Sequence, residues 1–273
     1  MPPDVPAVVV ESVSKIYGAT RALDRVSVSI PAGQFVAVIG RSGAGKTTLL
    51  RCLSRAVMPS AGAIAVGATD IVHLKGRALR RYRARTGMIY QQFNLVRRLA
   101  VMDNVLVGRL PHTAGLWRWA ALVRWFGAAD RDVAARALDH VGLLDRAWQR
   151  VDTLSGGQQQ RVAIARALAQ APELILADEP VASLDVANGT AVMESLRHRA
   201  ADAGLTVIAT LHHVEYARRF ADRVLGLADG RLVFDGPPAI LDDDALARVF
   251  GEIAGPELGH EPAATAQPSW APA

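Results

Sequence analysis

The chain has 273 residues, of which 51% are hydrophobic and 21% charged, with a formal net charge of +5. This composition is enough for a sizeable buried core, and the charge would suit a nucleotide or a membrane surface. A single cysteine, Cys52, excludes a disulfide framework and indicates a reducing compartment. We expect no signal peptide, and the lack of about 18 consecutive uncharged apolar residues excludes a self-sufficient membrane span.

The first segments predict an antiparallel sheet. Residues 7–13 and 22–30 are rich in β-branched residues that partly alternate with polar ones. Tyr17 lies between them in a predicted turn. Its ring is either half-buried packing or a flat face on which an adenine can stack.

A phosphate-binding loop follows. Residues 40–47 (GRSGAGKT) fit the pattern G-x-x-x-x-G-K-[ST], between an apolar strand at 35–39 and a helix at 48–53. Glycines let the backbone approach phosphates, and the helix N-terminus supplies positive potential. Lys46 is placed for the β- and γ-phosphates and the Thr47 hydroxyl for Mg²⁺.

A short strand is predicted at 61–67, followed by a basic segment. Its cations are Lys75, Arg77, Arg80, Arg81, Arg83 and Arg85. We favour a solvated helix face over contact with a charged partner or lipid headgroups.

Residues 87–91 predict another strand, which ends in Gln91. Ligands bind at the carboxyl ends of strands in open α/β sheets, so this amide could reach Mg²⁺ or an attacking water. The alternative is an ordinary loop glutamine.

Helical spacing dominates residues 92–168, as in 130–144 and 158–168, which predicts a helical subdomain inserted into an α/β core.

Within this region, residues 116–126 hold three of the five tryptophans. One helical stripe contains Trp119, Leu122, Val123 and Phe126, while Trp117 and Trp125 lie beside it. The segment either packs on its own subdomain or docks partly exposed on a membrane partner or the lipid interface.

A second anion site is predicted at residues 154–158 (LSGGQ), which open the helix 159–168. Ser155 is a candidate N-cap, and the free N–H groups of the first turn attract anions. One nucleotide does not need both sites within one subunit, which hints at a site shared between two copies.

The apolar run 174–177 ends in Asp178 and Glu179. Asp178 suits Mg²⁺ and Glu179 the water that attacks the γ-phosphate. Paired acids could merely cap a turn, but the phosphate loop in the same chain favours catalysis.

The strand predicted at 205–211 is followed by His212, which could donate to the γ-phosphate. His213 comes next, and we expect only one of these two histidines to have a role in the site. Residues 224–227 and 231–234 flank Ala-Asp-Gly and predict a hairpin. The Ala- and Pro-rich residues 251–273 are expected to form a mobile tail.

Together these motifs resemble the ATPases of ABC transporters. The resemblance covers roughly residues 7–250 and is carried by the segments 40–47, 154–158 and 178–179, by Ser183, Leu184 and Asp185, and by Gln91 and His212. It implies an α/β P-loop NTPase fold: a RecA-like core with an antiparallel β part and the inserted helical subdomain. It also implies a head-to-tail dimer that holds two ATP molecules.

The resemblance assigns roles to individual residues. Catalytic roles fall on Lys46, Gln91, Glu179 as general base, and His212 as switch histidine. Mg²⁺ would be held by Thr47, Gln91 and Asp178. ATP would contact Tyr17, Gly40, Arg41, Ser42, Gly43, Ala44, Gly45, Lys46, Thr47 and Thr48 of one subunit and Ser155, Gly156, Gly157 and Gln158 of the other, with Asp185 communicating across the dimer.

Further segments are similar to the phosphonate-import ATPases, namely residues 51–53, 87–96, 104–110, 177–185 and 226–236 and the tryptophan-bearing insertion. His213 and the proline-rich tail depart from that pattern without touching the core chemistry.

The resemblance therefore implies a Mg²⁺-dependent ATPase at the cytoplasmic face of the inner membrane. Its partners would be transmembrane permease subunits and, indirectly, a periplasmic binding protein. No nucleic acid is expected to take part. The alternatives are another cargo, such as a polar amino acid importer or an exporter, a nucleotide-binding regulator that does not hydrolyse, or a soluble ATPase of DNA repair or translation.

Overall fold

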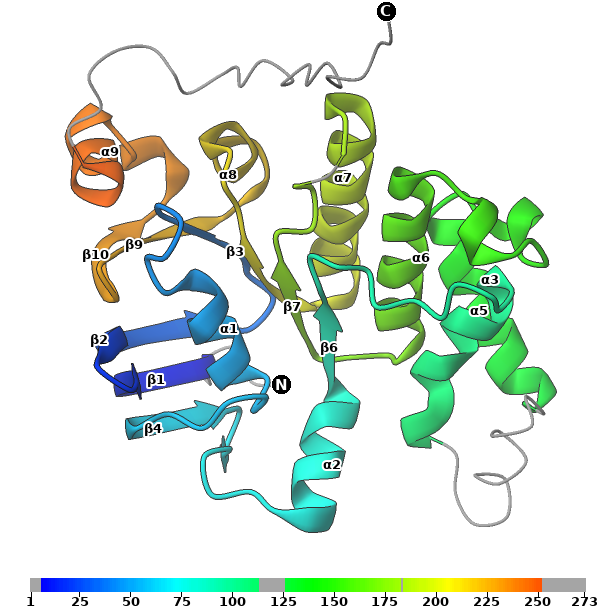
Figure 1. The fold of residues 1–273 in the computed structure, drawn as a ribbon, viewed down its shortest axis with the longest axis horizontal. Coiled ribbons are helices and arrows are strands. Elements are labelled where there is room, and N and C mark those ends of the chain that lie inside the picture. Colours follow the sequence, from blue (N-terminus) through cyan, green and yellow to red (C-terminus); the bar gives the residue numbers. More distant parts are fainter. Residues whose placement is uncertain (1–5, 113–125, 183, 252–273) are drawn as a thin grey trace, which may run out of the picture.

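The computed structural model of the chain describes residues 6–112, 126–182 and 184–251. Figure 1 shows a small sheet at one side, a larger sheet in the middle and a group of helices at the other side. The tryptophan segment, apart from Phe126, and nearly all of the predicted tail lie outside the described residues.

The small sheet is antiparallel, as the alternation in the sequence predicts. Its strand order is β2-β1-β4-β5. The strands are β1 (Pro6–Tyr17), β2 (Thr20–Pro31), β4 (Ala61–Val66) and β5 (Thr69–Asp70). Val8, Val10 and Val13 of β1 are buried, whereas Glu11 and Ser12 are exposed, so the strand covers a core with one face.

The larger sheet has the order β10-β9-β3-β8-β7-β6. Its strands are β3 (Phe35–Ile39), β6 (Thr86–Ile89), β7 (Leu174–Asp178), β8 (Thr206–Thr210), β9 (Arg223–Ala228) and β10 (Arg231–Gly236). All pair in parallel except β10, which forms the predicted hairpin with β9. Because parallel strands share a direction, the carboxyl ends of β3, β6, β7 and β8 meet at one edge of the sheet.

The central strand β3 is buried on both faces and separates two hydrophobic cores. Phe35, Ala37 and Ile39 belong to one core, whereas Val36 and Val38 belong to the other. Successive side chains of a strand point to opposite faces, so a continuous apolar run serves both cores.

One core lies against the helices α3 (Val101–Leu106), α5 (Ala128–His140) and α6 (Gly156–Ala169), which pack on one another. The 3-10 turns η1 (Val107–His112), η2 (Leu144–Arg146) and η3 (Val151–Thr153) connect them. The prediction that α5 extends to residue 144 is wrong, because this helix ends at His140 and Gly142 adopts φ 64° just beyond it. Phe126 is buried in the same core, and the other residues of the predicted stripe lie outside the described residues.

The remaining helices surround the larger sheet. They are α1 (Lys46–Leu53), α2 (Gly76–Arg85), α7 (Val186–Ala203), α8 (Val214–Phe220) and α9 (Asp243–Phe250), with a 3-10 turn, η4 (Pro238–Ile240), before α9. Within the described ranges, no helix has the length and apolar character needed to cross a membrane.

Candidate functional site

The loop between β3 and α1 approaches neighbouring backbone so closely that only glycine fits at two positions. A Cβ on Gly40 (φ 151°) would lie 2.2 Å from the Leu227 carbonyl oxygen, and one on Gly45 (φ 102°) 2.4 Å from that of Ala22. Both glycines also adopt φ values that L side chains rarely take. The loop is therefore fixed against β2 and β9 at the N-terminus of α1, where anions are favoured.

Lys46 begins α1 and lies inside this loop. Its Nζ donates to the Gly40 carbonyl at 2.7 Å and to the Arg41 carbonyl at 3.0 Å. Burial lowers the pKa of Lys46, although the charges of Glu179 and Asp178 oppose that effect. The other residues predicted to contact ATP differ in exposure. Arg41, Ser42 and Gly43 are exposed, Ala44 is buried, and Thr47 and Thr48 are half-buried.

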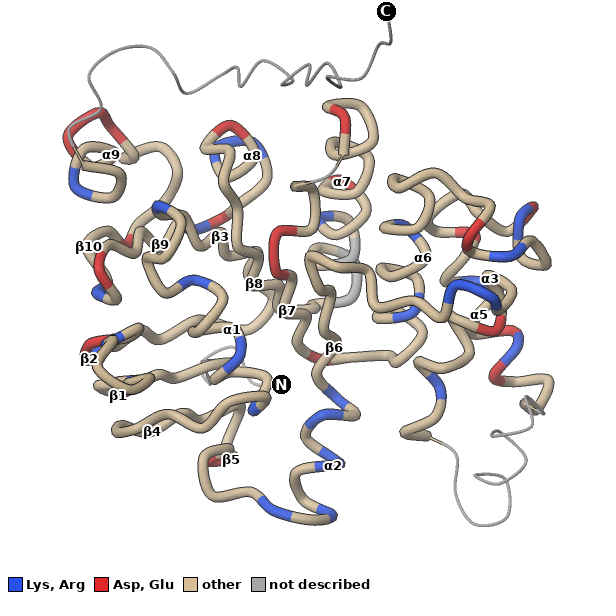
Figure 2. The backbone as a smooth tube through the Cα atoms, in the orientation of Figure 1, with Lys and Arg blue, Asp and Glu red and all other residues tan. Residues whose placement is uncertain are grey.

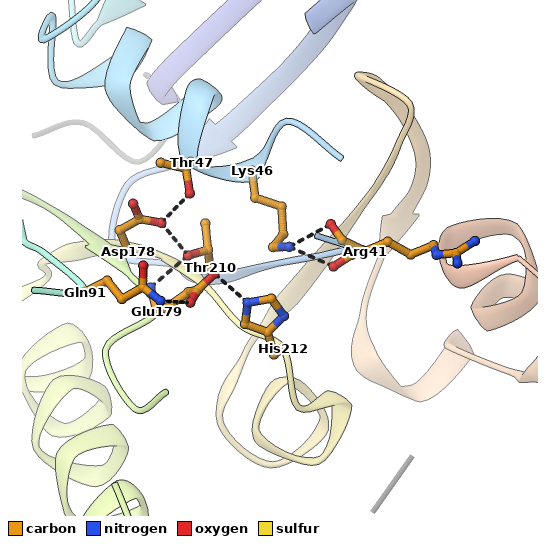
Figure 3. A network of polar contacts seen from close by, with 9 residues as sticks. Arg41, Lys46, Thr47, Gln91, Asp178, Glu179, Thr210 and His212 are labelled. Carbon is orange, nitrogen blue, oxygen red and sulfur yellow. Dashed lines mark hydrogen bonds and ion pairs between the residues drawn. The ribbon is translucent and has the colours of Figure 1, made fainter. Parts of the chain in front are cut away.

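Two hydroxyl groups donate to the Asp178 carboxylate at the end of β7 (Figure 3). Thr47 Oγ1 donates to Asp178 Oδ1 at 2.9 Å, and Thr210 Oγ1 donates to the same oxygen at 3.0 Å. Thr47 is in the first turn of α1 and Thr210 ends β8, so three elements converge on one carboxylate.

The Glu179 carboxylate lies between Gln91 and His212 (Figure 3). Gln91 Nε2 donates to Glu179 Oε2 at 2.7 Å, and His212 Nε2 lies 2.5 Å from Glu179 Oε1. Gln91 is two residues beyond the end of β6 rather than at the last strand position, because β6 ends at Ile89. The arrangement holds one carboxylate, only 13% exposed, between an amide and an imidazole.

Four predicted residues thus lie at or just beyond the carboxyl ends of the parallel strands. They are Gln91, Asp178, Glu179 and His212. His213 does not join them: it is the N-cap of α8, and its ring lies edge-on to Tyr216. The sequence reasoning missed Thr210, although a polar residue that ends an apolar strand is the same signal that singled out Gln91.

The predicted second anion site forms the N-terminus of α6. Ser155 caps the helix: its Oγ accepts from the Gln158 N–H at 3.3 Å, and the Gln158 side chain accepts from the Ser155 N–H at 3.0 Å. Ser155 and Gly156 are exposed. Among the described residues, no hydrogen bond joins residues 155–158 to the phosphate loop.

Two further predicted residues lie outside the polar cluster. Asp185 caps α7 by accepting from the Asn188 N–H at 2.9 Å, and these hydrogen bonds hold the pKa of its carboxyl below the usual range. Tyr17 ends β1 with its ring exposed and Lys15 Nζ 4.8 Å from the ring centroid. Both remain accessible to a ligand or a partner.

The donor set at Asp178 fits a magnesium ion better than a closed metal site. No group of three or more His, Cys, Asp or Glu side chains that could hold a metal occurs in the described part of the chain. Mg²⁺ usually takes one or two protein oxygens and completes its shell with phosphates and water. Thr47 Oγ1 and Asp178 Oδ1, which lie 2.9 Å apart, provide such a pair.

The basic segment is α2, along which Figure 2 shows a run of cationic residues. Its arginines are exposed while Tyr82 is buried, as expected for a solvated helix face. A cavity of about 490 Å³ beside the helix is lined by Arg77, Arg80, Arg81, Arg83, Ala84, Leu110, Pro111 and Gln170. Arg85 instead pairs with Glu173.

The chain is similar to known proteins in sequence and in fold. Residues 23–182 match the family described as "ABC transporter". The chain is 49% identical over 254 residues to "Phosphonates import ATP-binding protein PhnC" of Rhodopseudomonas palustris strain BisB5, covering 93% of each chain. A protein of the same name from Bradyrhizobium diazoefficiens is 48% identical over 254 residues, again with 93% of each chain covered.

Solved structures show the same architecture. The dimeric, ADP- and phosphate-bound post-hydrolysis state of the ATP-binding cassette MJ0796 superposes with a TM-score of 0.76 at 32% identity, covering 85% of this chain and 98% of that chain. The cassette MJ1267 in its ADP conformation gives a TM-score of 0.77 at 22% identity, covering 89% and 98%, which supports the fold alone. The family match over residues 23–182, the 49% identity over 93% of the chain and the shared fold establish that this chain belongs to the ABC transporter family.

Proposed function

We propose that this chain is the ATP-hydrolysing subunit of an importer that takes up phosphonates. The observation that carries the hydrolytic part is the Glu179 carboxylate, held between Gln91 and His212 next to a phosphate loop. The cargo rests on the 49% identity to a phosphonates import protein over 93% of the chain. In this proposal the cassette spans residues 7–250, with a helical subdomain at about 92–168.

ATP would bind with its phosphates over residues 40–48. Lys46, whose amine now bonds loop carbonyls 2.7 and 3.0 Å away, would exchange them for β- and γ-phosphate oxygens. Thr47 and Asp178 would hold Mg²⁺, which neutralises charge that develops on the phosphates. Tyr17 would stack on the adenine, since its ring is exposed at the end of β1.

Glu179 would accept a proton from the water that attacks the γ-phosphate. Gln91 and His212 fix the direction of its carboxylate, and Gln91 lies two residues after β6, the strand next to β7. During turnover, His212 would donate to the γ-phosphate. General base catalysis of this kind contributes about 10²- to 10⁴-fold to a rate.

Two copies would complete each ATP site. ABC cassettes dimerise and work with transmembrane permeases. Residues 155–158 form an exposed helix N-terminus that no hydrogen bond within the described residues joins to the phosphate loop, so they are free to meet the ATP of a second subunit. Asp185 caps α7 and lies six residues after Glu179 in the sequence. It would communicate between the two subunits of that dimer.

In the cell, the dimer would bind permease subunits at the cytoplasmic face of the inner membrane. A periplasmic binding protein would deliver the phosphonate to the permease, and nucleic acid plays no part. The exposed arginines of α2 suit an acidic partner surface. The tryptophans at 117 and 125, outside the described residues, stay candidates for membrane recruitment.

The test is ATP hydrolysis in membranes that contain the complete candidate transporter. Binding protein loaded with methylphosphonate should stimulate hydrolysis, whereas binding protein with a polar amino acid should not. Hydrolysis that ignores phosphonate would reject the cargo and keep the ATPase. No hydrolysis, with ATP still bound, would favour a non-hydrolysing regulator.

A further inference from the structure

Thr210 joins the two acidic residues of the site through a single hydroxyl group. It ends β8 opposite Asp178 in the sheet register and is completely buried. Its Oγ1 donates to Asp178 Oδ1 at 3.0 Å and accepts from the Glu179 backbone N–H at 2.9 Å. Because a hydroxyl has one proton, donation to Asp178 turns a lone pair towards Glu179.

The backbone of Glu179 needs such support. Its φ is 50°, in the left-handed region, which is strained for a residue with a Cβ. A second bond holds the next residue: Gln160 Nε2 donates to the Pro180 carbonyl at 2.7 Å, and Gln160 is buried. The strained residue is therefore fixed on both sides by side chains from β8 and α6.

We propose that Thr210 is a positioning residue for hydrolysis: it holds the Glu179 backbone so that the carboxylate stays between Gln91 and His212. The proposal rests on the role proposed above for Glu179. Without the Thr210 hydroxyl, Glu179 loses the partner of its N–H and relaxes towards negative φ. Its carboxylate then leaves the position from which it takes a proton from water.

The decisive variant is Thr210→Val, which keeps the shape and the strand preference of the side chain and removes the hydroxyl. In the complete transporter, kcat should fall about 10- to 100-fold, as for loss of a hydrogen bond that aligns a charged group, while KM for ATP stays within about twofold. Thr210→Ser, which restores the hydroxyl, should recover kcat to within about threefold.

A matched control lies on the same strand. Thr206 is as deeply buried as Thr210, and its Oγ1 accepts from the Gly33 N–H at 3.0 Å, at the far end of β8. Thr206→Val therefore removes one buried hydrogen bond without reaching the site. If Thr206→Val and Thr210→Val lower kcat equally at equal melting temperatures, the role of Thr210 is structural and the proposal fails.

A double variant separates the two routes by which Thr210 could act. In a Glu179→Gln background, Thr210→Val should cause no further loss of rate, because the carboxylate it positions is gone. An additional loss, or a raised Mg²⁺ concentration for half-maximal activity in Thr210→Val alone, would show action through Asp178 and overturn the proposal.

Failure of the proposal and failure of the proposed function give different results. If Glu179→Gln hydrolyses ATP at the normal rate, the proposed role of Glu179 is wrong. If Glu179→Gln is inactive while Thr210→Val retains full kcat, the role of Glu179 stands and only the positioning role of Thr210 is rejected.

Discussion

The Glu179 carboxylate is held at both oxygens, by Gln91 at 2.7 Å and by His212 at 2.5 Å. Glu179→Gln keeps the size of the side chain and removes its basicity. We expect the steady-state rate of phosphate release to fall at least about 100-fold, since general base catalysis is worth that much or more. Binding of ATP, measured with a fluorescent analogue, should be retained.

The same substitution at Glu173 provides the control for Glu179→Gln. Glu173 directly precedes β7 but pairs with Arg85 on the surface, with 61% of its side chain exposed. Glu173→Gln should leave phosphate release at the rate of the unchanged protein. Turnover at the normal rate in Glu179→Gln would exclude Glu179 as the base.

Lys46 is the one cation buried within the phosphate loop among the described residues. Burial lowers the pKa of its amine, and the negative charges of Glu179 and Asp178 oppose that effect. Lys46→Ala removes hydrogen bonds from a charged donor, so ATP affinity measured by titration calorimetry should fall about 10- to 100-fold.

Lys75→Ala is the control for Lys46→Ala, because Lys75 is exposed at the start of α2. It should bind ATP as the unchanged protein does. Equal affinity of Lys46→Ala and Lys75→Ala would remove Lys46 from the phosphate site.

At the scale of elements, an ion cluster ties the β9–β10 hairpin to β2 and to the phosphate loop. The buried carboxylate of Asp24 on β2 accepts from Arg231 on β10 at 2.8 Å and from Arg21 at 2.8 Å. The turn of the hairpin also bonds the loop, because the Gly230 N–H donates to the Ala44 carbonyl at 3.2 Å. The cluster therefore helps to hold the hairpin turn in place, and that turn contacts the phosphate loop.

This cluster gives a pH-dependent prediction. Hydrogen bonds from Arg231 and then Arg21 hold the pKa of Asp24 below its usual value. The charged form thus stabilises the fold above the unfolded pKa of about 3.9, and that stabilisation is lost as the pH falls through the folded pKa. Asp24→Asn should lower the melting temperature at pH 7, and the difference from the unchanged protein should shrink below about pH 4.

Asp145 is a suitable control for Asp24, because it also pairs with an arginine but is exposed. Its Oδ2 lies 3.7 Å from Arg146 Nε. Asp145→Asn should leave the melting temperature unchanged at both pH values. A difference between Asp24→Asn and the unchanged protein that persists undiminished in acid would show that the Asp24 charge does not contribute.

The elements also show which parts of the site could be predicted from sequence. The predictions for the phosphate loop, Asp178 and Glu179 each rest on a few consecutive residues, so a local pattern is enough to make them. Thr210 and Gln160 act through contacts between strands and helices far apart in the chain, with Thr210 touching residues 31 and 32 positions away. The end of α5 was missed because Gly142 stops a helix whose apolar spacing continues.

At the scale of the whole molecule, the two predicted anion sites lie on different elements of the described part of the chain. The phosphate loop lies at the start of α1 and residues 155–158 at the start of α6. If two copies form each ATP site, subunits damaged at different sites should complement each other. Lys46→Ala damages the loop, and Gly156→Asp adds a negative charge at the other site.

Gly156→Asp should not disturb its own subunit. A Cβ on Gly156 meets nothing within 4 Å, and an acidic residue in the first turn of a helix is favourable.

Each variant alone should form ATP-dependent dimers poorly, as measured by sedimentation. Mixed one to one, they form a heterodimer in which the intact loop of the Gly156→Asp subunit faces the intact residues 155–158 of the Lys46→Ala subunit. One of the two sites is then whole, so ATP-dependent dimerisation and part of the hydrolysis should return. A mixture no more active than its two components would mean that each subunit completes its site alone.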